Sequence, residues 1–418
     1  MRSDTMLIPL ICFVIISLST ICVTESDLSP FCAIKDPEVQ FVNNLGFQLL
    51  NQMTKSVGNV FISPLGASFA LGMTYSGAAS RTAQELEEIW KDSDGQFATE
   101  KVYERLGKFF TSPDDNEKQF TLWNGFLLQN GYEMKEDFVN KLKNFYFVEP
   151  KIINFINASV ADEINEFFNK ETNGKFEEII AENETVSHLS KILLLNAVAL
   201  NETWKVQFPP ERTKRDYFYS GRRETTEVRM MSMEAESFKF YEDLEMKYKF
   251  LEIPYKDDKM NMVLALPTQY DQPANIQMDS RLFCEIKNKM SHTKLDMIAF
   301  PKYRFETQTS LKDAFMDLGI QDAFNPLQAN FSNIQDDSDL YVSDIIQKAI
   351  VEVNETGNEE SVITKLKIMP VAFRGVKEFI ANHPFIFYVE DTNSGVILFS
   401  GRVDEPSESI PVNRELTF

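Results

Sequence analysis

Near its C-terminal end the sequence reads Phe379-Ile-Ala-Asn-His-Pro-Phe-Ile-Phe-Tyr-Val389. The last five residues of this stretch are all apolar or aromatic, a composition typical of a buried β-strand. A second strand-like run, Ala349-Ile-Val-Glu-Val353, precedes it. The two runs predict a well-packed sheet in the C-terminal part of the chain.

About thirty residues connect these two predicted strands, and they show weak strand character and no helical period. Connections longer than about 15 residues are uncommon in compact domains and are usually functional or disordered. This connection is therefore the first candidate for a functional segment. The alternative is a surface insertion without a role.

The rest of the chain mixes helices and strands without the regular alternation of a parallel α/β fold. Apolar spacing and caps predict helices over 41–53, 64–73, 81–90 and 160–170. Predicted strands cover 60–62, 191–200, 250–254, 260–267, 297–303, 349–353, 385–389 and 396–401. The 35 phenylalanines are spread along all 418 residues, and no Gly/Ser- or Pro-rich linker divides them. We therefore predict one α+β domain with several large, mostly antiparallel sheets.

The N-terminal residues have the pattern of a targeting segment. Arg2 is followed by an almost unbroken apolar run from Met6 to Leu18, and the chain turns polar after Thr24. The run is shorter than the ~18 apolar residues that a membrane-spanning helix needs. We predict a signal peptide at residues 1–24, secretion into the extracellular space and a single domain over residues 25–418, with a retained anchor as the alternative. No other apolar stretch could span a bilayer, so we expect no membrane partner.

Two kinds of residue carry expectations about covalent modification. Cys32 and Cys284 remain after removal of the signal peptide and can form a single disulfide, although the sequence alone does not decide whether they pair. The glycosylation triplet Asn-x-Ser/Thr occurs at Asn157, Asn183, Asn201, Asn330 and Asn354. Behind a signal peptide, some of these asparagines should carry glycans at the surface.

The charge balance excludes two classes of partner. The chain has 42 basic and 63 acidic residues, a net charge of −21. This charge repels nucleic acids and anionic membranes, so we expect neither to bind. Two short basic clusters, Arg212–Arg215 and Arg222-Arg223, are interpreted as solvated surface.

Enzyme and metal motifs are missing from the sequence. His188, His292 and His383 are its only histidines, and neither they nor the cysteines have the spacing of a zinc site. The Gly-x-Ser-x-Gly nucleophile motif and a glycine-rich phosphate loop are missing too. We therefore predict a protein that is not an enzyme and that uses no metal or cofactor.

Seven segments, in order along almost the whole predicted domain, resemble the serpin family. They are Asn59-Val-Phe-Ile-Ser-Pro-Leu65, Gly77-Ala78 with Thr82-Ala-Gln-Glu-Leu86, Asn196-Ala-Val-Ala-Leu-Asn-Glu-Thr-Trp204 with Phe208, Val228-Arg-Met-Met231, Phe300-Pro-Lys302, Phe379-Ile-Ala-Asn-His-Pro-Phe-Ile-Phe-Tyr-Val389 and Phe399-Ser-Gly-Arg-Val403. Each segment alone is modest evidence, but their common order makes a chance resemblance improbable.

The resemblance implies the serpin fold, with three β-sheets, about nine helices and an exposed reactive-centre loop at about 355–378. In such proteins a target protease cleaves the loop and becomes bound to it as an acyl-enzyme. The cleaved loop then inserts into the main sheet as a new strand, and the active site of the protease is distorted. The fold is kinetically trapped, because the sheet gains this strand only after cleavage. We accordingly expect a monomer whose partner is a protease.

The resemblance also assigns roles to residues of the hinge and of the region beneath it, the breach. Glu355 opens the hinge, and Lys302 matches its ion-pair partner. Trp204 matches the indole beneath the point where insertion begins, with ordinary core packing as the alternative. Gly357 fits the small residues expected at the hinge.

Further polar positions match the shutter, the region where the main sheet opens. These are Ser63, Asn196 and Gln347. Gln347 stands where many members have histidine, and Gly66 where they have serine. An amide at position 347 can still form hydrogen bonds, so the shutter is expected to function.

The scissile bond follows from the usual length of the loop. Counting the family's seventeen residues from Glu355 places the bond between Val371 and Ala372. A small apolar residue before the bond suits an elastase-like protease. A shift of a few residues makes Phe373 or Arg374 the alternative, for a chymotrypsin-like or a trypsin-like enzyme. An elastase-like or chymotrypsin-like serine protease is therefore the favoured partner, and a cysteine protease is a second possibility.

The composition of the hinge departs from that of inhibitory members, which keep it small and mostly alanine. After Gly357 this chain has Asn358-Glu-Glu-Ser-Val-Ile-Thr364. Because side chains alternate across a strand, five would face inward after insertion, namely Asn358, Glu360, Val362, Thr364 and Leu366. A buried Glu360 carboxylate without a partner is costly. Two classes therefore stay open: a protease inhibitor, or a non-inhibitory serpin with a carrier, chaperone-like or storage role.

Overall fold

The computed structural model describes residues 37–90, 100–111, 120–181, 186–200, 202–220, 224–234, 236–336, 339–357 and 377–406. These residues form eight α-helices and sixteen β-strands. The helices are α1 (Pro37–Met53), α2 (Pro64–Gly77), α3 (Ser80–Trp90), α4 (Glu100–Thr111), α5 (Glu136–Phe145), α6 (Val160–Glu171), α7 (Ser280–Lys289) and α8 (Lys312–Asp317). The strands are β1 (Val60–Ile62), β2 (Phe120–Gln129), β3 (Lys151–Ile153), β4 (Ile192–Leu200), β5 (Lys214–Tyr219), β6 (Thr225–Glu234), β7 (Ser237–Asp243), β8 (Tyr248–Pro254), β9 (Met260–Pro267), β10 (Ser291–Lys294), β11 (Met297–Pro301), β12 (Tyr303–Ser310), β13 (Val342–Val353), β14 (Glu378–Ile380), β15 (Phe385–Asp391) and β16 (Ile397–Val403).

The strands form three sheets. One has seven strands in the order β1-β16-β15-β9-β8-β7-β10, one has four in the order β14-β11-β6-β5, and one has five in the order β12-β13-β4-β2-β3. Most neighbours are antiparallel, but β13–β4, β2–β3 and β11–β14 are parallel. The predicted α+β fold with three sheets is confirmed, and eight α-helices are described where about nine were expected.

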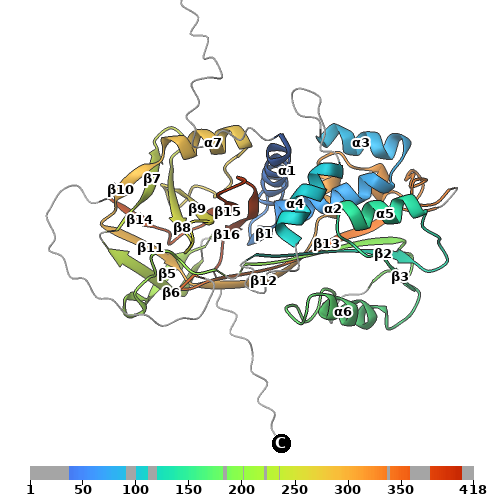
Figure 1. Cartoon of the computed structure of the whole chain (residues 1–418). Helices are drawn as coiled ribbons and strands as arrows, with labels where there is room; N and C mark the ends of the chain where they lie inside the picture. The colour runs from blue at the N-terminus through green and yellow to red at the C-terminus, as the bar shows by residue number, and fades with distance from the viewer. Residues whose placement is uncertain are drawn as a thin grey trace, which may run out of the picture.

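The five-stranded sheet lies at the centre of one half of the molecule, between two layers of helices. Figure 1 shows it nearly edge-on, with α2 and α5 on one side and α6 on the other. Every residue of β4 except Ala199 is buried, which explains its continuous apolar sequence. Under α6, the residues Val160, Ile164 and Phe168 form a core separate from the main one. This sheet is therefore covered on both faces.

Helix α2 is buried almost all round, and its start is set by local sequence. Ser63 is the N-cap, and its side-chain oxygen accepts a hydrogen bond from the backbone N–H of Gly66 at 3.2 Å. Pro64 occupies the first helical position, where its missing N–H costs nothing. The helix predicted for 64–73 extends to Gly77.

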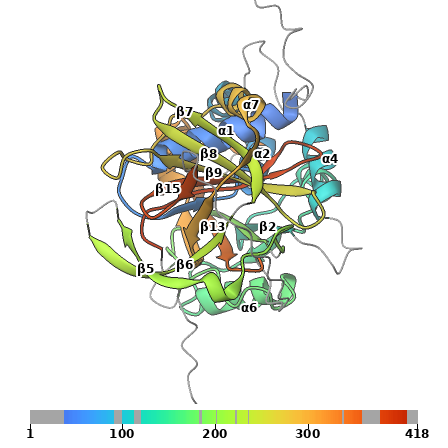
Figure 2. The same cartoon turned by 90° about the vertical axis from the view of Figure 1, so that its left-hand side faces the viewer.

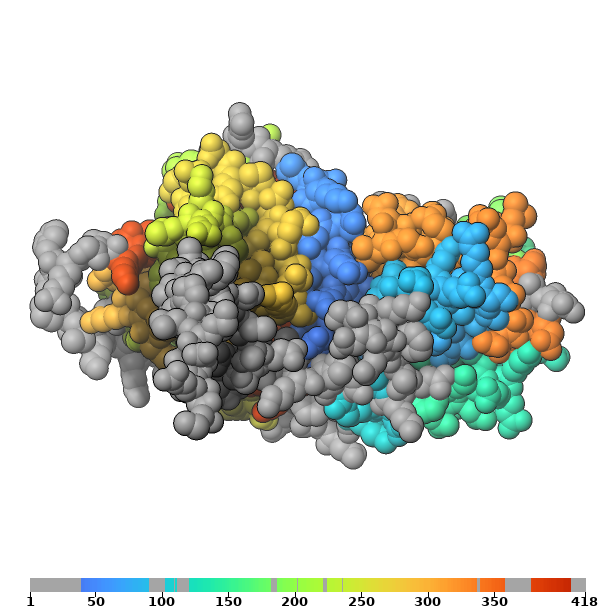
Figure 3. Space-filling model, turned by 90° about the horizontal axis from the view of Figure 1, so that it is seen from above, coloured from blue at the N-terminus to red at the C-terminus, as the bar shows by residue number. Residues whose placement is uncertain are grey.

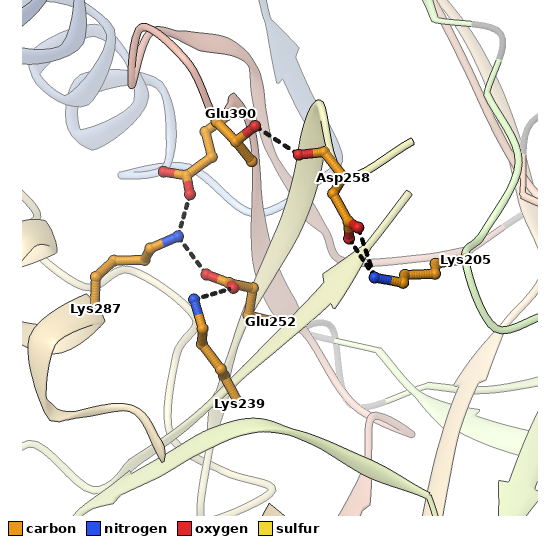
Figure 4. Close-up of polar contacts among 7 residues, drawn as sticks. Lys205, Lys239, Glu252, Asp258, Lys287 and Glu390 are labelled. Atoms are coloured by element: carbon orange, nitrogen blue, oxygen red, sulfur yellow. Dashed lines mark hydrogen bonds and ion pairs between the residues drawn. The ribbon is translucent and has the colours of Figure 1, made fainter. Parts of the chain in front are cut away.

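The seven-stranded sheet is tied to α7 by buried charges (Figure 4). Lys287 of α7 lies between the carboxylates of Glu252 on β8 and Glu390 on β15. Lys239 of β7 pairs with Glu252 at 2.8 Å. Burial opposes the charge of Lys287, but the two carboxylates outweigh it and hold the pKa of this lysine above its ordinary value. The pairing compensates charges that would otherwise be costly to bury.

Other views show how the remaining parts are arranged. Seen from above, the blue helix α1 lies between the yellow residues around α7 and the light-blue and orange residues of the other half (Figure 3). Strands β5 and β6 project on one side of the molecule, well away from α4 (Figure 2). Among the described residues, no helix has both the length and the apolar character needed to cross a membrane.

Two strand predictions were wrong in their limits. The strand predicted for 297–303 is divided at Lys302 into β11 and β12, which belong to different sheets. Strand β13 begins at Val342, seven residues before the predicted start at Ala349. The polar residues Asp344, Gln347 and Lys348 hid this part of the strand, because they interrupt its apolar pattern.

Candidate functional site: the hinge, the breach and the shutter

The candidate site follows the line of contact between β4 and β13, here called the seam. The two strands run parallel and pair from Ile192 with Val342 up to Ala199 with Ile350. Strand β13 continues beyond this point to Val353. The chain then turns back over the upper end of the seam, in the turn to which the resemblance assigns the hinge.

The hinge is a two-residue hairpin turn. The backbone N–H of Asn354 donates to the carbonyl of Gly357 at 2.9 Å, and the N–H of Gly357 donates back to the carbonyl of Asn354 at 3.2 Å. The side-chain Oδ1 of Asn354 also accepts bonds from the N–H and hydroxyl of Thr356 at 3.0 and 2.8 Å. The turn therefore directs the chain antiparallel to β13.

Gly357 is needed where the hinge approaches the top of β4. It forms an antiparallel bridge with Thr203, and its φ of +120° is rarely adopted by other residues. A Cβ atom at this position would lie 2.4 Å from the carbonyl oxygen of Glu202. The turn is thus held against the chain just beyond the end of β4 by the bridge between Gly357 and Thr203.

Trp204 lies directly beneath the hinge and is buried. Its indole Nε1 donates to the carbonyl of Asn354 at 2.9 Å, and its backbone N–H donates to the carbonyl of Thr356 at 2.7 Å. The indole stacks on Tyr255, with ring centroids 4.5 Å apart. Trp204 therefore does more than fill the core, because it holds the turn through two hydrogen bonds.

Glu355 and Lys302 are in contact, as the resemblance implied. Their side chains form an ion pair of 2.9 Å, and the hydroxyl of Thr213 donates to Glu355 at 2.7 Å. Burial alone would raise the pKa of the Glu355 carboxyl, but the bonds from Lys302 and Thr213 hold it below its ordinary value. The ion pair is therefore fully formed at neutral pH and weakens as the pH falls through this lowered pKa.

The shutter is a buried hydrogen-bonded network lower in the seam. Gln347 Oε1 accepts from the backbone N–H of Ser63 at 2.6 Å, and its Nε2 donates to Asn196 Oδ1 at 2.8 Å. Asn196 in turn donates to Asn124 Oδ1 at 2.7 Å. The network joins β13, β4, β2 and the start of α2. It satisfies polar groups that are costly to bury unpaired.

Gly66 packs against this network. A Cβ atom there would lie 2.1 Å from Asn196 Oδ1. The glycine thus makes room for the asparagine amide. Asn124 was missed in the sequence, although a single asparagine in the apolar strand 120–129 was a signal that could have marked it. Thr213 and Tyr255 carried no such signal.

Other predicted site residues are placed differently. Asn157 is exposed and Asn330 is half-buried, whereas Asn354 is only 8% exposed. A glycan on Asn354 would therefore require a different hinge conformation. Cys284 is buried on α7. Several predicted residues lie outside the described part of the chain: Cys32, Asn183, Asn201, Asn358, Glu360, Val371, Ala372, Phe373 and Arg374.

His383 has a structural position. It is buried, and its Nε2 lies 2.9 Å from the carbonyl oxygen of Pro267. Burial lowers the pKa of this imidazole. Within the described segments, no three His, Cys, Asp or Glu side chains are grouped so that they could hold a metal ion.

Comparison with known proteins decides the family. The family model described as serpin (serine protease inhibitor) matches residues 40–406. The chain is a serpin. It is 32% identical over 374 residues to glia-derived nexin of Rattus norvegicus, a match that covers 87% of this serpin and 92% of the relative.

Solved structures agree with this assignment. Native protease nexin-1, solved with heparin, is 28% identical, with a TM-score of 0.76 and coverage of 89% of this serpin and all of that chain. Human thyroxine-binding globulin, solved in complex with thyroxine, is 22% identical, with a TM-score of 0.78 and coverage of 90% of this serpin and all of that chain, and it supports the fold alone. Serpins bind target proteases and are generally inhibitors, not enzymes, but some members, including thyroxine-binding globulin, are non-inhibitory.

Proposed function

We propose that this serpin is a secreted, monomeric inhibitor of a serine protease and acts as a suicide substrate. Cleavage of the loop releases its first part, which enters the seam between β4 and β13 while the protease remains bound as an acyl-enzyme. The observation that carries the proposal is the hinge hairpin, which already bridges to Thr203 on one side and continues β13 on the other. Secretion is proposed from the signal-peptide pattern at residues 1–24.

The register of the hinge supports insertion. Asn354 and Gly357 pair with each other in the hairpin, so residues at equal distances from them lie opposite one another. Gln347 lies seven residues before Asn354, and Thr364 lies seven residues after Gly357. From β4, Asn196 likewise lies seven residues before Thr203, the bridge partner of Gly357. On insertion, both neighbours would therefore bring Thr364 to the level of the shutter. The two registers agree because β4 and β13 are already paired with the same offset, Gln347 opposite Asn196, so one strand could pair with both.

The same register identifies the unfavourable residue of the hinge. Glu360 would lie between Val351 and Leu200, each three residues from the hairpin on its own strand. Both neighbours are buried in the core. The Glu360 carboxylate would then have to be buried or protonated, which slows insertion. Slow insertion gives the acyl-enzyme time to hydrolyse and release active protease.

Glu360→Ala is therefore expected to improve inhibition. Removing the buried carboxylate should raise the insertion rate by about tenfold, which corresponds to a barrier lower by about 1.4 kcal/mol. The measurement is the number of inhibitor molecules consumed per protease molecule trapped, which should fall towards one. Glu359→Ala is the matched control, because the register places Glu359 on the opposite face, beside the half-exposed Glu352. If the two variants consume the same number of inhibitor molecules per trapped protease, the predicted register is contradicted.

The main test of the proposal is covalent trapping. We propose cleavage between Val371 and Ala372 by an elastase-like protease, with Phe373 and Arg374 as alternatives for chymotrypsin-like and trypsin-like enzymes. Incubation with pancreatic elastase, chymotrypsin, trypsin and a papain-like cysteine protease should give an SDS-stable complex with at least one of them. Mass spectrometry of the released C-terminal peptide then locates the scissile bond. Cleavage without an SDS-stable complex for every protease would contradict the inhibitory function.

A non-inhibitory role is the second candidate. It is favoured by the core-facing position that the register gives to Glu360, and the family contains members without inhibitory activity. Such a serpin would keep its loop outside the sheet and serve as a carrier, chaperone-like or storage protein. Loop cleavage without complex formation, together with an unchanged unfolding temperature, would favour this role.

A further inference from the structure

The lower end of the seam carries contacts that have no part in the proposed mechanism. Strand β4 begins there at Ile192, and β13 begins beside it at Val342. The backbone N–H of Ile192 donates to the carbonyl of Tyr341 at 3.2 Å, and the hydroxyl of Tyr341 donates to the carbonyl of Leu189 at 2.8 Å. Both bonds run from one side of the seam to the other. The chain segments that lead into the two strands are therefore joined as well as the strands themselves.

Three side chains at this end bind one another, and we call Lys191, Tyr132 and Asp339 the lower cluster. Lys191 Nζ lies 3.2 Å from Asp339 Oδ2 and donates to the hydroxyl of Tyr132 at 2.5 Å. The hydroxyl of Tyr132 in turn donates to Asp339 Oδ1. The ammonium group of Lys191 also lies 4.9 Å from the centroid of the Tyr132 ring. Each member of the lower cluster thus contacts both of the others.

The members of the lower cluster come from opposite sides of the seam. The carbonyl of Lys191 accepts from the N–H of Gln129 at 2.9 Å, so the residue before β4 is fixed to the end of β2. Tyr132 follows the end of β2 and lies on the same side. Asp339 precedes β13 and therefore lies on the other side. Separation of β13 from β4 at this end would pull the Asp339 carboxylate away from both of its partners.

The lower cluster differs from an isolated ion pair at the surface, which contributes little to stability. The side chain of Lys191 is 24% exposed, and it is held by an aromatic ring as well as by a carboxylate. The bond from Tyr132 holds the pKa of the Asp339 carboxyl below its ordinary value, so this group is charged at neutral pH. Groups that polarise and orient one another in a network bind more strongly than separate pairs do.

We propose that the lower cluster is a latch, which keeps the lower end of the seam closed when the upper end opens. Opening of the seam then takes two steps, because the contacts of the hinge and shutter can separate while Lys191 and Tyr132 still hold Asp339. A strand entering from the hinge would have only the upper part of the seam until the latch breaks, a consequence that rests on the proposed function. The latch itself needs neither a protease nor a cleaved loop.

Native-state hydrogen exchange, resolved to single amides, tests the latch in the intact full chain. Lys191→Met keeps the aliphatic stem and removes the ammonium group, so exchange of the Ile192 amide should become faster on the order of tenfold. The Trp204 amide, which donates to the carbonyl of Thr356 at the upper end, should exchange as before. Lys143→Met is the matched control and should change neither amide, because its ion pair with Glu149 at 3.0 Å does not cross the seam.

A double-mutant cycle shows whether the members of the lower cluster act together. Tyr132→Phe keeps the ring and removes the hydroxyl, and it should accelerate exchange of the Ile192 amide about threefold. The double variant should show a smaller acceleration than the product of the two single effects, because both side chains act through Asp339. An unchanged Ile192 amide in Lys191→Met, equal acceleration of the Ile192 and Trp204 amides, or single effects that multiply would overturn the latch. Because every readout is taken on the uncut protein, failure of covalent trapping would remove the proposed function and leave the latch in place.

Discussion

Cleavage of the reactive-centre loop is expected to raise the midpoint of thermal unfolding by about 20 °C. Insertion of about twelve residues between β4 and β13 replaces one set of hydrogen bonds by two, a net gain of about 16 bonds at roughly 1 kcal/mol each. The unfolding entropy of a chain of this size is about 0.8 kcal/mol per kelvin, which converts that gain into the stated shift. The size of the shift distinguishes insertion from a local change at the cut.

The measurement compares the intact and cleaved proteins by calorimetry or by circular dichroism on heating. Thr364→Arg provides the control, because the register places this large cation between Gln347 and Asn196 in the buried shutter. The cleaved Thr364→Arg protein should melt close to its intact form. An unchanged midpoint in the unmodified sequence would mean that the loop stays outside the sheet, and the non-inhibitory role would then be preferred.

Gln347→Leu is expected to weaken the contact between β4 and β13, so that the two strands separate more readily. The substitution removes the partners of the Ser63 N–H and of Asn196 Oδ1, and both groups are buried. Leaving them unpaired costs about 2–5 kcal/mol in total, which lowers the thermal midpoint by about 3–6 °C. The weakened seam also exposes strand edges that can pair with other molecules. Gel filtration after mild heating should therefore show high-mass species that are missing in the unmodified protein.

Gln347→His is the matched control for this prediction. Histidine is the residue found here in many serpins, and its ring can donate one hydrogen bond and accept another, as the amide does. The histidine variant should keep most of the stability that the leucine variant loses. If both variants lose the same amount of stability, the shape of the glutamine side chain stabilises the fold and the hydrogen-bonded network does not.

Helices and strands could be predicted from the sequence where their own composition and caps match the burial that they have in the fold. Strand β4 was recognisable because it is apolar throughout, and α2 because Ser63-Pro64 combines a cap with a first-turn proline. The start of β13 was missed because Gln347 and Lys348 are polar residues that tertiary contacts bury. Propensity and pattern cannot reveal that a polar side chain is buried when its partner lies 284 residues away, as Ser63 does from Gln347.

The resemblance predicted the main residues of the candidate site but not the contacts that complete it. Glu355, Lys302 and Trp204 were placed by motif, and the structure brings all three to the top of the seam. The hairpin at Asn354–Gly357 was not predicted, because it depends on a bridge to Thr203 across the fold. A pocket lined by Arg215, Arg229 and Lys302 was missed for the same reason, because these residues come from β5, β6 and the junction of β11 with β12, which are separated in sequence.

The parallel pairing of β4 with β13 determines where a new strand can enter. A segment that turns back from the end of β13 must run opposite to it, and because β4 points the same way as β13, the segment runs opposite to both. The boundary between β12 and β13 offers no such place, since those two strands point in opposite directions. Chain direction thus favours entry between β4 and β13 over entry between β12 and β13. Entry would also exchange a parallel contact for two antiparallel ones, which are slightly more stable per residue.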